Sequence, residues 1–198
     1  MKKIVNHYGK GSIEAPINFQ VEGISNKAAA PLLMQAVVNT AQKVPEGRLI
    51  NAVTLPWIQI VNKLKDDPTF AHQISPEKWE EIIAGAYDKA GFDEVILTPR
   101  SGDFGRDVIA TKCGIGTIRI IDQVKAFKPG HLVSANDVRA LMGVLQGDKA
   151  SKGFLTTTSD FAPRIKVDPL ITPFIPSQLQ LINGKELIER LHKISLDS

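Results

Sequence analysis

Hydrophobic positions in the first third of the chain recur at helical spacing. Residues 27–43 are rich in alanine and leucine and predict a helix that ends at Pro45. Residues 53–65 predict a second helix, with Trp57 and Val61 on its apolar face. The sequence therefore predicts a mostly helical N-terminal extension over residues 1–74.

From residue 75 onward the pattern alternates between helices and strands. Ser75 is a good helix cap and Pro76 suits the first helical position, so a helix is expected to begin there. Two further helices are expected after Ser134 and after Gly184. Short runs rich in β-branched residues predict strands over 94–99, 107–112, 117–125, 154–158 and 179–182.

The order of these elements predicts the fold class. A hairpin followed by a crossover helix and another strand implies an α/β domain with a mixed central sheet flanked by helices. We therefore expect two units, a helical extension over residues 1–74 and an α/β domain over residues 75–198.

Composition restricts the classes of protein and site. Hydrophobic residues make up 43% and charged residues 23%, values typical of a globular protein, and the formal net charge of +3 permits nucleic acid as a partner. Cys113 is the single cysteine, and no zinc-type spacing with histidines occurs. No apolar run approaches the length of a membrane span and no leader pattern is present, so a cytoplasmic protein without membrane contact is expected.

Three polar residues near the predicted hairpin carry candidate chemistry. Gln123 and Lys125 are two apart on one strand and therefore share a face, and Asp107 begins the neighbouring strand. Phosphodiester hydrolysis requires oxygen ligands for a divalent metal and a lysine that activates water or stabilises charge at phosphorus. Asp122 is expected on the opposite face and is therefore a poor substitute for Gln123.

The helix after Ser75 offers a further carboxylate for such a metal. Glu81 lies nearly opposite the apolar face of this helix, whereas Glu80 lies on its border, where it can reach past the sheet edge. We therefore predict Asp107, Gln123 and Glu80 as metal ligands, with Lys125 completing the catalytic set.

Six segments follow one another along the chain, at residues 76–80, 90–92, 101–108, 122–125, 153–158 and 181–187. In this order they resemble the Mrr-type catalytic domain of the PD-(D/E)xK restriction endonucleases. The resemblance covers roughly residues 75–195 and implies an α-β-β-β-α-β core that cuts DNA with Mg²⁺, or with Mn²⁺ in its place. It also implies that Asp107 is the metal-binding aspartate, that Gln123 and Lys125 form the family's QxK motif, and that Glu80 is its helix glutamate.

Two departures from the superfamily pattern leave an alternative open. Arg106 stands where proline is common, and the neutral Gln123 stands where the superfamily consensus has an acid. The main hypothesis is a metal-dependent endodeoxyribonuclease acting in restriction, phage defence or DNA processing. The alternative is a DNA-binding module or complex subunit with an inactive or regulatory nuclease site.

Partners follow from the same pattern. DNA contacts are predicted at Arg106, Lys128, Lys152 and Thr157, and no motif for a nucleotide cofactor is present. Cutting both strands requires two sites, which favours a homodimer. The helices expected in residues 1–74 either form its pairing surface or only cover the core.

Overall fold

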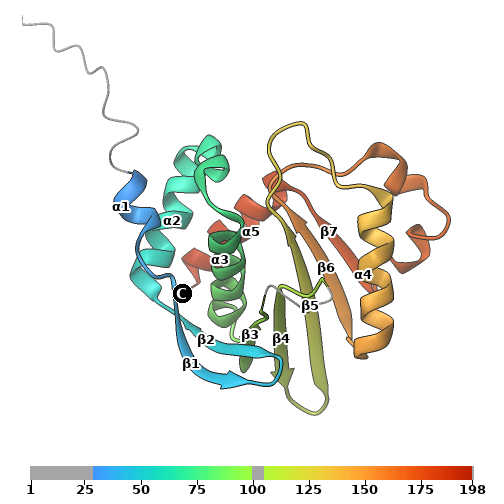
Figure 1. The fold of residues 1–198 in the computed structure, drawn as a ribbon, viewed down its shortest axis with the longest axis horizontal. Coiled ribbons are helices and arrows are strands. Elements are labelled where there is room, and N and C mark those ends of the chain that lie inside the picture. Colours follow the sequence, from blue (N-terminus) through green and yellow to red (C-terminus); the bar gives the residue numbers. More distant parts are fainter. Residues whose placement is uncertain (1–28, 100–104, 198) are drawn as a thin grey trace, which may run out of the picture.

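The computed structural model describes residues 29–99 and 105–197 of the 198-residue chain. Within these ranges the chain forms a seven-stranded sheet with helices on both faces (Figure 1). In chain order the elements are α1 (Ala29–Leu33), β1 (Val38–Val44), β2 (Gly47–Ala52), α2 (Thr54–Asp66), η1 (Pro68–Gln73), α3 (Pro76–Lys89), β3 (Glu94–Leu97), β4 (Val108–Cys113), β5 (Thr117–Lys125), α4 (Ala135–Asp148), β6 (Lys152–Thr157), η2 (Pro163–Val167), η3 (Thr172–Phe174), β7 (Leu179–Ile182) and α5 (Gly184–Leu196).

The sheet is mixed, as predicted. Strands β1 to β5 pair antiparallel with their neighbours in chain order. Strand β6 pairs parallel to β5 because α4 carries the chain back across the sheet, and β7 pairs parallel to β6 after a return through η2 and η3. The carboxyl ends of β5 and β6 therefore lie side by side, with Lys125 opposite Thr157.

Two hydrophobic cores cover the two faces of the sheet. On one face α2, α3 and α5 bury a core that includes Trp57, Trp79 and Ile82. On the other face α4 and the segment after β6 bury a smaller core around Leu141 and Leu155. Figure 1 shows α3 and α4 on opposite sides of β5 and β6.

The predicted helix starts are confirmed. The Ser75 hydroxyl accepts a hydrogen bond from the Lys78 N–H (3.2 Å) at the start of α3. Ser134 and Asp137 form a reciprocal capping box at the start of α4. All five predicted strands are present, and those over 117–125 and 179–182 have the predicted bounds.

The predicted helix over 27–43 is wrong beyond Leu33. The chain instead forms strand β1 and turns through Pro45 and Glu46 into β2, which pairs with β3. Most of β1 is exposed, so it lacks the alternating apolar pattern that reveals a half-buried strand. Its conformation depends on pairing with β2, a tertiary contact that overrides local helix propensity.

The described part of the N-terminal segment shares the main core. Trp57 of α2 is fully buried and donates a hydrogen bond from Nε1 to the Ile82 carbonyl (2.9 Å). At the start of β2, Gly47 has a φ of 152°, and a Cβ there would lie 2.1 Å from the Leu97 carbonyl oxygen. The sheet and core thus continue across residue 74, and the predicted boundary at that residue stays a prediction. In the same described ranges, no helix has both the length and the apolar character needed to cross a membrane.

Candidate active site

Asp107 lies immediately before β4 and is held against β5. Its backbone N–H donates to the Asp122 carbonyl (3.2 Å), and its carboxylate Oδ2 accepts a hydrogen bond from the Val124 N–H (2.6 Å). Thr98 fixes the same segment from β3, because its N–H donates to the Asp107 carbonyl (3.2 Å). These contacts orient the carboxylate toward the segment of β5 that contains Gln123.

Gln123 presents a buried amide to this position. The residue is 9% exposed, and its Oε1 has no hydrogen-bond partner among the described residues. A Cβ at Gly105 would lie 2.7 Å from Gln123 Nε2, and Gly105 has a φ of 80°, so a larger residue would displace the amide. A buried acceptor without a partner is energetically unfavourable, and a cation would satisfy it.

Lys125 lies on the same face of β5, as the alternation predicted. Its Nζ is 3.8 Å from Asp137 Oδ1, at the start of α4. Burial alone would raise the pKa of Asp137, but hydrogen bonds from Ser134 and the charges of Lys125 and His131 outweigh it and lower the pKa. Asp137 therefore keeps its charge and anchors the ammonium group, a role that the sequence analysis missed.

Asp122 points to the opposite face, also as predicted. Its Oδ2 accepts a hydrogen bond from the Tyr87 hydroxyl (2.9 Å) beneath α3. Burial raises the pKa of Asp122 to about 7, and the charge of Asp107 adds to the rise. The hydroxyls of Thr156 and Tyr87 lower the pKa and partly offset this rise. Neither Thr156 Oγ1 nor Asp122 Oδ1, however, makes a hydrogen bond of good geometry with any described group.

Glu80 lies in the first half of α3 and is partly buried. Helix α3 contacts β4 and β5 from the face that Asp122 shares, whereas Gln123 and Lys125 point to the face covered by α4. Glu80 and Asp107 each take part in a further interaction within the protein. Across residues 29–99 and 105–197, no group of three His, Cys, Asp or Glu side chains is placed to hold a metal ion.

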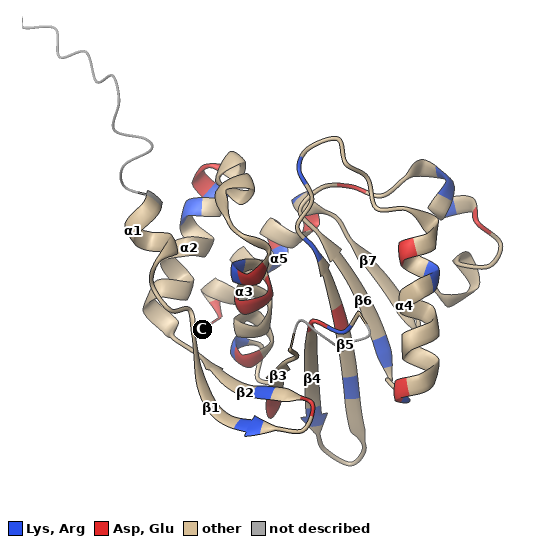
Figure 2. Ribbon diagram, viewed as in Figure 1, with Lys and Arg blue, Asp and Glu red and all other residues tan. Residues whose placement is uncertain are grey.

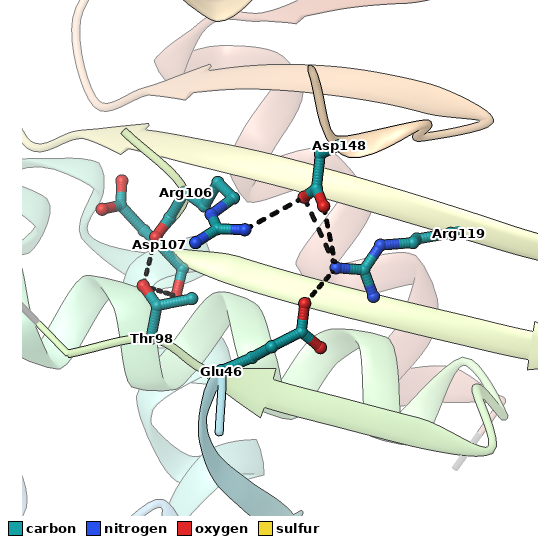
Figure 3. Close-up of polar contacts among 6 residues, drawn as sticks. All are labelled: Glu46, Thr98, Arg106, Asp107, Arg119 and Asp148. Carbon is teal, nitrogen blue, oxygen red and sulfur yellow. Dashed lines mark hydrogen bonds and ion pairs between the residues drawn. The ribbon is translucent and has the colours of Figure 1, made fainter. Parts of the chain in front are cut away.

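Arg106, the residue before Asp107, belongs to a network of alternating positive and negative side chains. Arg106 Nη1 is 3.3 Å from Asp148 Oδ2 at the end of α4, and Asp148 Oδ1 is 3.3 Å from Arg119 Nη2. Arg119 also reaches Glu46 of the β1–β2 turn (2.6 Å), as Figure 3 shows. This network ties Arg106 to α4 and links the N-terminal hairpin to the Asp107 segment.

The four predicted DNA-contacting residues are not brought to one surface. Lys128 is exposed in the loop after β5, and Arg106 pairs with Asp148. Thr157 is fully buried, and its hydroxyl donates to the Lys125 carbonyl (2.8 Å). Lys152 lies 5.5 Å from the centre of the Phe154 ring and pairs with Ile120, about 16 Å along β5 from Lys125 at roughly 3.3 Å per residue.

Comparison with known proteins assigns this arrangement to a family. The sequence profile of the Mrr catalytic domain, described as "Restriction endonuclease", matches residues 71–191. The chain belongs to the Mrr-type restriction endonuclease family. Its mixed sheet flanked by helices is accordingly the PD-(D/E)xK fold, and all four predicted catalytic residues fall within the match.

The individual relatives share low sequence identity with this chain. The "Type IV methyl-directed restriction enzyme EcoKMrr" of Escherichia coli K12 is 26% identical over 98 residues, which are 48% of this chain and 32% of that protein. The solved structure of the "DNA modification-dependent restriction endonuclease AspBHI" is 16% identical, with a TM-score of 0.46 over 79% of this chain and 38% of that one. That of the "MspJI Restriction Endonuclease in Complex with 27-mer Oligonucleotide" is 18% identical, with a TM-score of 0.43 over 69% and 30%. This Mrr-type chain thus spans about a third of the length of the relatives that it matches.

Proposed function

We propose that this Mrr-type chain is a metal-dependent endodeoxyribonuclease that acts in restriction of DNA. The observation that carries the proposal is the buried, unpartnered Gln123 Oε1 beside the oriented carboxylate of Asp107, with Lys125 on the same face of β5. Membership of the restriction endonuclease family supports the same reaction class.

The residues present suit Mg²⁺ or Mn²⁺. Asp107 supplies a charged oxygen and Gln123 a neutral one, and hard divalent cations prefer oxygen ligands. Glu80 of α3 is the proposed third ligand. Because α3 covers the face of the sheet that Asp122 shares, the Glu80 side chain would have to reach past the ends of the strands to meet Gln123. When bound, such an ion polarises the phosphoryl oxygens and lowers the pKa of a bound water.

The protein's own groups complete the proposed mechanism. Lys125, anchored by Asp137, places its ammonium group beside the scissile phosphate, where it offsets the negative charge that builds at phosphorus. The hydrogen bond from Val124 N–H keeps the Asp107 carboxylate in place when the ion exchanges. Preorganisation of this kind lowers the barrier because the groups do not need to rearrange during the reaction.

A plasmid assay tests the proposal directly. We expect supercoiled plasmid to be nicked or linearised with Mg²⁺ or Mn²⁺ and to remain intact with EDTA. Because relatives are described as methyl-directed or modification-dependent, plasmid DNA with and without methylation should be compared. Binding of either plasmid without cleavage in both metals would instead support the DNA-binding module with an inactive site. The neutral Gln123 favours that alternative, since it leaves the site with one fewer negative charge than an acid would.

The same assay addresses a proposed homodimer. Simultaneous appearance of linear product indicates paired sites, whereas accumulation of nicked circles indicates one site acting alone, and light scattering of the full chain reports its mass. Of the two roles left open for the helix over 53–65, covering the core is supported by the burial of Trp57, Ile60, Val61 and Leu64 of α2. A second copy would therefore have to contact other surfaces.

A further inference from the structure

A groove of about 510 Å³ opens at the carboxyl end of β6, on the face of the sheet that α2, α3 and α5 cover. Segments far apart in the sequence line it: the end of α2, the 3₁₀ helix η1, the start of α3, the residues after β6 and helix α5. Its polar lining includes Lys65, His72, Thr158, Ser159, Lys185 and His192. None of these six residues belongs to the predicted catalytic set.

The groove adjoins the candidate active site along the backbone. Thr158, at its wall, donates a hydrogen bond from its N–H to the Lys125 carbonyl (3.2 Å). Trp79, at its floor, directly precedes Glu80 on α3 and is held by a hydrogen bond from its indole to the Ala71 carbonyl (3.1 Å). The groove therefore lies between the helix of Glu80 and the strand end of Lys125.

Charge in the groove is predominantly positive. Lys65 and Lys185 contribute two positive charges. The one carboxylate in its lining, Glu189, lies 3.9 Å from Lys185, and both side chains are largely exposed to water. Figure 2 shows basic residues on α2 close to η1, where the last turn of the helix carries Lys63 and Lys65.

One buried atom in the groove lacks a partner. His192 Nδ1 is inaccessible to water and has no hydrogen-bond partner among the described residues. Buried polar atoms are usually satisfied by protein, water or a ligand. Because this atom is not exposed to the groove, charged contacts with a phosphate in the groove come from the lysines.

We propose that this groove binds the sugar–phosphate backbone of the DNA strand that enters the Asp107–Gln123–Lys125 site. The inference rests on the proposed function. A duplex carries one phosphate per about 3.4 Å of axis on each strand, so a strand held at Lys125 presents further phosphates within reach of the groove. Lys65 and Lys185 bind these phosphates, while the accessible apolar lining at Pro68 and Ile188 contacts the sugars.

The groove draws on residues outside the part of the chain that matches the family. Lys65 and His192 lie outside residues 71–191, the part that matches the family. Lys65 joins Lys185 because α2 packs against α5, the helix that carries both Lys185 and His192. The N-terminal segment thus contributes a DNA-binding residue, in addition to its part in the core.

The test is a matched pair of charge-reversal variants. Lys65→Glu/Lys185→Glu reverses two groove charges, and Lys43→Glu/Lys166→Glu makes the same change in net charge at two exposed lysines outside the groove. Binding of a fluorescent duplex is measured in EDTA over a range of salt concentrations, and cleavage with Mg²⁺ is measured at saturating DNA. Thermal melting confirms that each variant is folded.

We expect the groove variant to bind DNA about 10- to 100-fold more weakly than the control variant. The slope of log Kd against log salt should fall by about 2, since each lost phosphate contact removes about 0.9. The rate at saturating DNA should stay within about threefold of wild type, because the groove affects binding rather than the reacting bond. Lys65→Arg/Lys185→Arg should restore binding.

The outcomes separate this inference from the proposed function. If wild type cuts DNA but both charge-reversal variants bind it equally well, the groove proposal is wrong and the nuclease proposal stands. If wild type binds DNA through the groove without cutting, the groove stands and the nuclease proposal fails. Absence of any DNA binding by wild type would overturn both.

Discussion

The two faces of strand β5 place neighbouring polar residues in opposite surroundings. On the face toward α4, Lys125 pairs with Asp137, and the Val124 N–H between Gln123 and Lys125 holds the Asp107 carboxylate at the site where we propose that a cation and a phosphate bind. On the face toward α3, Asp122 is buried under Tyr87, and burial raises the pKa of this acid to about 7. The carboxylate of Asp122 is therefore not a better metal ligand than the amide of Gln123 merely because it can carry a charge. The comparison teaches that the face of a strand decides whether a polar residue serves chemistry or only affects stability.

Loss of the Asp107 charge should have the largest effect. Asp107→Asn keeps an oxygen that can accept the Val124 N–H but removes the negative charge, so the protein should fold normally and bind metal poorly. We expect plasmid cleavage with Mg²⁺ to fall by about 10³-fold or more, on the scale of a lost electrostatic contribution to catalysis. The measurement is a single-turnover rate alongside a melting curve. A variant that cuts at the wild-type rate would place the active site elsewhere.

Replacement of Lys125 should have an intermediate effect on the same face. Lys125→Met keeps most of the side-chain volume and removes the ammonium group, so the transition state loses a stabilising charge. We expect turnover to fall by about 10²-fold while Kd for DNA changes by less than about threefold. Rates at saturating DNA and binding in EDTA separate the two quantities. The opposite result, with weakened binding and an unchanged rate, would make Lys125 a phosphate anchor.

Asp122→Asn should change stability rather than catalysis. Because the folded-state pKa, about 7, exceeds the ordinary value of 3.8, the folded protein binds more protons than the unfolded chain between these pH values. This group's contribution is therefore most favourable below the ordinary pKa and is lost as pH rises through the folded-state pKa. At pH 8 the asparagine variant should be more stable by on the order of 1 to 4 kcal/mol.

Denaturant titrations at pH 5 and pH 8 measure this difference. The gain in stability from Asp122→Asn should be larger at pH 8 than at pH 5. Cleavage by the Asp122 variant should remain within a few-fold of wild type. If the variant instead loses cleavage without losing stability, Asp122 acts in the reaction and the two faces are not independent.

Several elements of the fold were predictable because their signals are local. The α3 start at Ser75 and the capping box of Ser134 and Asp137 each depend on residues within three positions of one another. The short turn of the β4–β5 hairpin is likewise a local signal. Strand alternation placed Gln123 and Lys125 on one face and Asp122 on the other. By contrast, β1 is an exposed edge strand whose structure comes from its pairing with β2, so its own residues gave no strand pattern.

The sequence by itself determined the order of elements from α3 onward and the shared face of Gln123 and Lys125, because helix caps and strand alternation act over a few residues. Only the tertiary structure decided that Arg106 pairs with Asp148, that Asp137 anchors Lys125, and that Lys65 and Lys185 line one groove. These contacts join residues that are separated along the chain, some by more than a hundred positions. No local pattern encodes such pairs, since they form only after the sheet has twisted and the helices have packed against it.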